Sequence, residues 1–84
     1  MANLPTTSKG LSFEWDEKKE VLEIHTNRKG LESLISQLQV LLNTKQDNDH
    51  IHMMTPVWSG EELTSERQNE TAKLINHVKI FRWK

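Results

Sequence analysis

One amphipathic helix pattern constrains this chain more than any other feature of its sequence. Between residues 31 and 42, apolar residues occupy every position that one face of a helix presents, at spacings of three and four residues. Of the six residues between them only Val40 is apolar, and Asn27 is placed to cap the first turn. We expect the inward faces of strands to cover this stripe, which consists of Leu31, Leu34, Ile35, Leu38, Leu41 and Leu42.

Alternating apolar and polar residues predict strands on both sides of this helix. Residues 11–15 and 20–26 alternate around a polar turn at residues 16–19, which predicts an antiparallel hairpin. A third strand is expected at residues 50–55, and Pro56 ends it because proline cannot donate to a sheet ladder. A fourth strand is expected at residues 73–83. The pattern predicts an α+β fold of ββαββ order: a four-stranded, mostly antiparallel sheet with the helix packed on one face.

The alternation also divides the side chains of the sheet between a helix-covered face and an open face. We expect Val78 and Ile80 in the core and Phe81 and Trp83 on the open side. Residues 56–72 form a connection so long that a functional or partly structured role is expected. Residues 1–10 are small and polar, which predicts a flexible N-terminal tail before a single domain at residues 11–84.

Composition limits the classes of function. A chain of 84 residues buries a compact core and leaves little room for a deep substrate cavity. Eleven Lys and Arg against 12 Asp and Glu give a net charge of −1, which argues against nucleic-acid and membrane-surface partners. The chain has no cysteine, no apolar run of signal-peptide length and no segment of about 20 apolar residues. We therefore expect a cytoplasmic protein.

The histidines are the sharpest candidate for chemistry. With these strand phases, all four histidines project from the helix-free face, where imidazoles could bind zinc or another borderline metal. In the alternative reading they are half-exposed sheet residues that pair with Glu23 or Glu14 across strands. No nucleophilic elbow, phosphate loop or paired-carboxylate motif accompanies them, so we predict neither catalysis nor a cofactor. A metal-binding module remains the alternative function, with the ligands His25, His50, His52 and His77.

The connection after Pro56 is the candidate partner-binding surface. Trp58 lies between Pro56 and Gly60, and a tryptophan rimmed by acidic residues is typical of a protein-binding hot spot. In the alternative reading Trp58 folds back over one end of the core and pins its own loop. The acidic residues of this candidate surface are Asp47, Asp49, Glu61, Glu62, Glu66 and Glu70.

Three segments of the chain resemble the immunity protein 32 family of bacterial polymorphic-toxin systems. They are the run from His52 to Pro56, the spacing of Trp58, Gly60 and Leu63, and residues 74–80 with Trp83 closing the chain. The resemblance covers roughly residues 20–83. It implies a non-catalytic protein that binds and neutralises a cognate toxin domain.

The exposed aromatic residues of the last strand add a further hypothesis, a homodimer built on the open sheet face.

Overall fold

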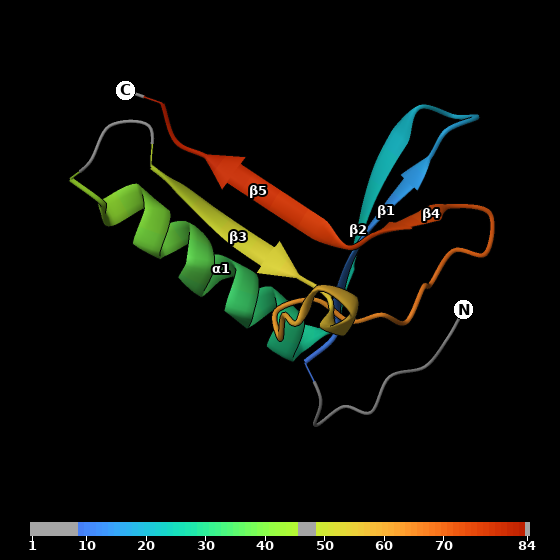
Figure 1. The fold of residues 1–84 in the computed structure, drawn as a ribbon, viewed down its shortest axis with the longest axis horizontal. Coiled ribbons are helices and arrows are strands. Elements are labelled where there is room, and N and C mark those ends of the chain that lie inside the picture. The colour runs from blue at the N-terminus through green and yellow to red at the C-terminus, as the bar shows by residue number, and fades with distance from the viewer. Residues whose placement is uncertain (1–8, 46–48, 84) are drawn as a thin grey trace.

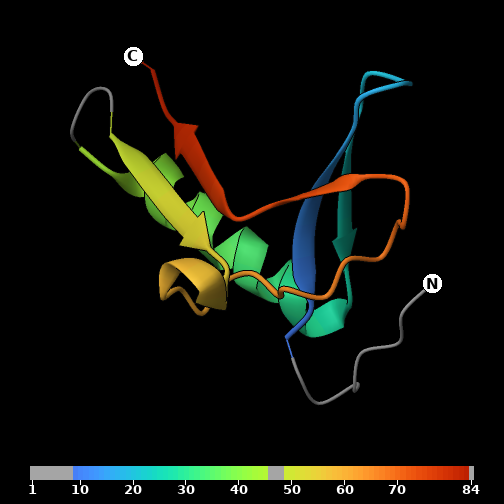
Figure 2. The same cartoon turned by 45° about the vertical axis from the view of Figure 1, so that its right-hand side comes forward.

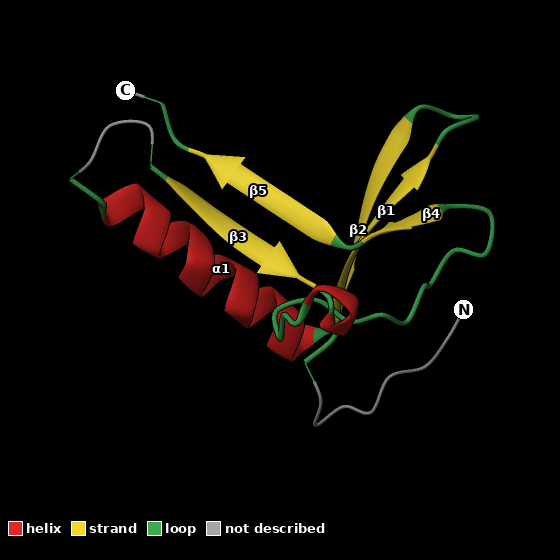
Figure 3. Cartoon of the chain, in the orientation of Figure 1, coloured by secondary structure: helices red, strands yellow, loops and turns green. Residues whose placement is uncertain are grey.

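The computed structural model describes residues 9–45 and 49–83, so residues 1–8 of the predicted tail lie outside the described part. The described residues form β1 (Leu11–Asp16), β2 (Val21–Thr26), α1 (Arg28–Asn43), β3 (His50–Met54), the 3-10 turn η1 (Pro56–Trp58), β4 (Lys73–Ile75) and β5 (His77–Phe81) (Figures 1 and 3). Among these residues no helix has the length and apolar character needed to cross a membrane.

The strands form two sheets, so the prediction of a single four-stranded sheet is wrong. One sheet has the antiparallel order β2-β1-β4, and in the other β3 pairs antiparallel with β5. The predicted closing strand divides at Asn76, whose carbonyl accepts a hydrogen bond from the Thr55 amide (3.0 Å). The Asn76 side-chain oxygen also accepts one from the Thr55 hydroxyl (2.8 Å). Figure 2 shows the two sheets diverging from this bend.

The predicted helix is present, and its first turn is fixed to the start of β1. The side-chain oxygen of Asn27 accepts hydrogen bonds from the amides of Gly30 and Gly10, both at 2.9 Å, so Asn27 caps the helix as predicted. Gly30 lies so close to Gly10 that a Cβ atom at residue 30 would be 1.9 Å from the Gly10 carbonyl oxygen. This contact sets the rotation of α1 about its own axis.

The core lies where the helix and the two sheets meet. Four buried side chains form it, and Leu34, Ile75, Val78 and Ile80 pack around them. The predicted phase of the last strand is confirmed after the bend, because Val78 and Ile80 face the core whereas Phe81 and Trp83 are exposed. It is wrong before the bend, because the alternation put Ile75 on the open side and Ile75 packs on the core. The helix is covered less completely than predicted: Leu41 is buried and Leu34 half-buried, and the rest of the stripe is largely exposed. The four central side chains are Leu11, Phe13, Met53 and Leu63.

Strand β1 is buried on both faces, although its alternating pattern predicted a half-buried strand. Leu11 and Phe13 enter the core, and the polar face that carries Ser12, Glu14 and Asp16 is also buried. The connection from η1 to β4 covers that polar face: the amide of residue 64 donates to the Leu11 carbonyl (2.8 Å). A connection of this length therefore serves as a wall of the domain.

Candidate protein-binding site

A tight turn after β3 presents Trp58 to solvent. The Thr55 carbonyl accepts hydrogen bonds from the amides of Trp58 (2.9 Å) and Gly60 (3.0 Å). Ser59 takes the left-handed conformation, with φ of 64°, which reverses the chain. Gly60 packs so tightly on Met54 that a Cβ atom there would lie 2.3 Å from the Met54 carbonyl oxygen. The backbone is thus held, yet the Trp58 residue is 56% exposed, which is more than a core-covering indole would be.

Trp58 forms one wall of a shallow groove where the two sheets diverge. The groove has a volume of about 410 Å³ and is lined by Trp15 of β1, by Trp58 and by residues 73–77 of β4 and β5. The ring of Trp58 lies 5.7 Å from that of His77, tilted by 41°. Sequence reasoning missed Trp15, because it shares the phase of the core residues Leu11 and Phe13 and was therefore read as interior. The groove suits a side chain of a protein partner better than an enclosed small molecule.

Three of the four histidines lie in a row on the exposed face of the β3–β5 sheet, beside this groove. The Nε2 atoms of His50 and His52 are 2.9 Å apart, and Nδ1 of His52 lies 3.0 Å from Nε2 of His77. The ring of Phe81 stacks on His50 with 4.8 Å between centroids. Partial desolvation lowers the pKa of His52, and the positive charges that His50, Lys79 and His77 can carry lower it further.

The fourth histidine lies apart, so the predicted cluster of four is wrong. His25 is on β2, in the other sheet, and its Nε2 contacts the Glu23 carboxylate of the same strand at 2.9 Å. The row itself does not converge on one point, because His52 uses opposite nitrogens for its two neighbours. In the described part of the chain, the three histidines of the row do not bring one ligand atom each to within 4.8 Å of the other two.

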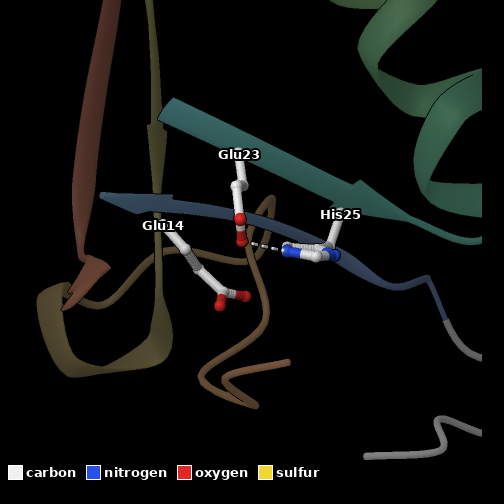
Figure 4. Close-up of side chains that lie close together, drawn as sticks. All are labelled: Glu14, Glu23 and His25. Carbon is white, nitrogen blue, oxygen red and sulfur yellow. Dashed lines mark hydrogen bonds and ion pairs between the residues drawn. The ribbon is translucent and has the colours of Figure 1, made fainter. Parts of the chain in front are cut away.

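Two carboxylates and one histidine on β1 and β2 do bring their ligand atoms together. One ligand atom each of Glu14, Glu23 and His25 lies within 4.8 Å of the others (Figure 4). Their oxygens already accept hydrogen bonds from the connecting loop: Glu14 from the amides of Gln68 (2.9 Å) and Asn69 (2.8 Å), and Glu23 from the Asn69 side chain (3.0 Å). The cluster therefore fastens the loop to the sheet.

Glu14 is the central member of this cluster. It is fully buried, and its carboxylate also accepts the Ser12 hydroxyl at 2.5 Å. Burial raises the pKa of Glu14, but the hydrogen bonds from Ser12 and from the amides of Gln68 and Asn69 outweigh burial, and the pKa falls below its ordinary value. The Glu23 pKa is lowered by hydrogen bonds from Asn69 and then from His25. Sequence reasoning treated Glu14 only as a cross-strand partner for histidine.

The acidic residues proposed from the sequence occupy different environments. Glu61, Glu66 and Glu70 are exposed. The carboxylate of Glu62 accepts the Met54 amide (3.1 Å), and that of Asp49 accepts the Thr44 hydroxyl and the His50 amide, both at 2.9 Å. Hydrogen bonds from Thr44 and then from the His50 amide lower the pKa of Asp49. Asp47 lies outside the described residues.

Comparison with known proteins identifies the family of the chain. Neither the curated proteins nor the solved structures that were compared give a match. The sequence model of the immunity protein 32 family matches residues 21–78, which are 58 of the 84 residues and run from β2 to the start of β5. The match includes the Trp58 turn and the histidine row up to His77, and it excludes β1. The chain therefore belongs to the immunity protein 32 family.

Proposed function

We propose that this chain neutralises a cognate bacterial polymorphic toxin by binding one of its domains, without catalysis, and that Trp58 is the central contact. The observation that carries the proposal is the combination of a held backbone and an exposed indole. Two main-chain hydrogen bonds to Thr55 fix the turn, yet more than half of Trp58 remains accessible.

A tryptophan held in this way has the properties of a binding hot spot. Hot-spot residues are enriched in tryptophan and lie where neighbouring contacts exclude water. Because the Trp58 turn is already ordered, this chain loses little conformational entropy there when a partner binds. The groove beside it, walled by Trp15 and His77, offers a complementary site for a partner side chain.

Exposed acidic residues complete the proposed surface. Glu61, Glu66 and Glu70 lie on the same connection as Trp58 and carry charges that a basic toxin surface would attract. The net charge of −1 means that this attraction is local to the connection. Glu62 and Asp49 stay in the proposal, but their carboxylates also hold backbone amides, so substitutions there alter stability as well as binding. Asp47 stays in the proposal as well.

Calorimetric titration with the C-terminal domain of the toxin encoded beside this chain tests the proposal. We expect Trp58→Ala to weaken binding by about 30- to 1,000-fold, which corresponds to a hot-spot loss of about 2–4 kcal/mol. Trp83→Ala is the matched control, since Trp83 is 81% exposed and lies away from the turn. An unchanged affinity in Trp58→Ala refutes the role of Trp58. A neighbouring toxin domain that neither binds the wild-type chain nor is inhibited by it refutes the function.

Metal binding is a second candidate function, favoured by the gathering of His50, His52 and His77 on one sheet face. A metal would replace the imidazole contacts, and His52 would turn so that one nitrogen of each ring reaches the ion. Calorimetric titration with Zn²⁺ tests this candidate. Binding should be lost in His52→Ala and retained in His25→Ala, because His25 lies in the other sheet. No heat of binding with the wild-type chain would exclude it.

A further inference from the structure

We infer that the chain forms a homodimer through an apolar surface of α1 and β2. Its centre is a seam of four side chains along α1, each between 40% and 70% exposed: Leu31, Ile35, Leu38 and Leu42. An isolated exposed leucine needs no explanation, but a continuous apolar row of this kind marks a surface that another molecule covers. The occupant that the structure favours is a second copy of this chain, and the inference does not depend on the toxin.

The rotation of α1 leaves the seam uncovered in the single chain. Gly30 and Leu41 are buried and Leu34 is half-buried, so this side of the helix faces the core. With 3.6 residues per turn, the centre of the apolar stripe lies about 60° around the helix from that buried side. The helix cannot turn to bury the whole stripe, because Gly30 packs against the Gly10 backbone with no space between them. The outer half of the stripe thus faces solvent.

The spacing of the seam matches the packing of two helices. Its residues are separated by four, three and four positions, the repeat with which apolar residues meet along a helix–helix interface. In a two-fold dimer the same surface serves both copies, so residues that pack on one another across the axis come from one short segment. Antiparallel or crossed packing of α1 on its copy would satisfy this condition.

The scarcity of charge along α1 after its first turn, which carries Arg28 and Lys29, favours a second copy over a charged partner. Between residues 30 and 43 the only charged residue is Glu32, and the seam is flanked by serine and glutamine. Side chains near a two-fold axis meet their own copies, where like charges would repel, so an uncharged row suits self-association. A membrane-surface helix would instead carry lysine or arginine along the whole length of its apolar face.

A stable dimer needs more area than the seam provides, so we include β2 in the same surface. Stable dimers bury about 800 Å² on each partner, which is about an eighth of the 6271 Å² of this chain. The four side chains of the seam offer less area than that. Leu22 and Ile24 of β2 are each about half exposed, and Ile24 pairs with core residue Phe13, so both lie on the core-facing side of the sheet. Strand β2 is also an edge of its sheet and immediately precedes α1, so the proposed interface includes its exposed apolar side chains.

Sedimentation analysis of the full chain, without toxin, tests the inference. The wild type should sediment as a species of about 20 kDa, twice the 9.8 kDa of one chain. The double substitution Ile35→Glu with Leu42→Glu should raise the dimer dissociation constant at least 100-fold with an unchanged far-ultraviolet circular dichroism spectrum. Val40→Glu is the matched control: Val40 is 66% exposed on the opposite side of the same helix, and this variant should remain a dimer.

Several results would overturn the inference. One is a wild-type chain that stays at 9.8 kDa at millimolar concentration. Another is a dimer that Phe81→Ser dissociates and the seam variant does not, which would assign the interface to the open sheet face. A monomeric wild type whose toxin binding is lost in the seam variant would assign the seam to the toxin. If the double variant loses its helical spectrum, the milder Leu42→Gln decides by the same mass measurement.

Discussion

The buried carboxylate of Glu14 gives the sharpest test of how this fold is held together. Replacing Glu14 by glutamine keeps the size of the side chain and removes its charge. The carboxylate accepts three hydrogen bonds, from the Ser12 hydroxyl and from the amides of Gln68 and Asn69. In Glu14→Gln, the amide oxygen can keep the partners of only one carboxylate oxygen. The new NH₂ group then faces a donor.

The structure sets the magnitude of the loss. Ser12 and Gln68 bond to one oxygen of Glu14, and Asn69 bonds to the other. The best orientation of glutamine keeps the first pair as weaker neutral bonds and leaves the Asn69 amide unpaired. Since a hydrogen bond to a charged group contributes about 1.5–3 kcal/mol, we expect the free energy of unfolding to fall by about 2–4 kcal/mol. The whole domain has about 4–13 kcal/mol, so the loss is readily measured.

Urea unfolding at pH 7 and at pH 3 provides the assay. Because the pKa of folded Glu14 lies below its ordinary value of 4.5, its stabilising contribution is present above pH 4.5 and is lost as the pH falls through the folded pKa. The difference between wild type and Glu14→Gln should therefore be full at pH 7 and smaller at pH 3, because below pH 4.5 the unfolded wild-type chain binds the proton more strongly than folded Glu14 does. The other carboxyls titrate in both proteins and cancel in the comparison.

Glu17→Gln is the control, because Glu17 is exposed in the turn between β1 and β2 and should unfold like the wild type. The reasoning fails if Glu14→Gln costs less than about 0.5 kcal/mol, the range of ordinary surface substitutions. It also fails if the cost is the same at both pH values, because the charge would then contribute nothing.

Two further substitutions test local features of the structure. Gly30→Ala should destabilise the chain by about 1–3 kcal/mol in urea unfolding, although alanine normally favours a helix, because the added Cβ atom would meet the Gly10 carbonyl oxygen; a more stable variant would contradict the close approach. The pKa of His52 in the folded chain is lowered from 6.5, so the unfolded chain binds the proton more strongly. Lowering the pH below 6.5 should therefore reduce the urea midpoint of the wild type more than that of His52→Gln. Equal reductions would show that the row does not perturb His52.

The sequence predicts well those features that depend on neighbours along the chain. The helix and its Asn27 cap follow from residue spacing within one element. The alternation of β3 and β5 correctly places Met53 and Val78 inside and the histidines outside. Three of the four predicted histidines meet for the same reason, since two adjacent antiparallel strands with known phases bring their outward side chains together.

Contacts between distant segments decided the remaining features. The bend at Asn76 divides the last strand because Thr55, 21 residues earlier, binds both its carbonyl and its side chain. Glu14 is buried because amides 54 and 55 residues later close over it. Neither partner shows a local pattern that predicts these contacts, and the prediction of a single sheet was wrong for that reason.

The sequence by itself therefore determined the helix, the strands before it and β3, the inward and outward phases of β3 and β5, and the immunity-protein resemblance that the family match confirms. The tertiary structure alone decided which side of α1 is covered and how far Trp58 is exposed. The physical reason is that periodicity fixes which residues share a face of one element. Close approaches such as that of Gly30 to Gly10 fix how that face is turned toward the rest of the chain, and these depend on the whole fold.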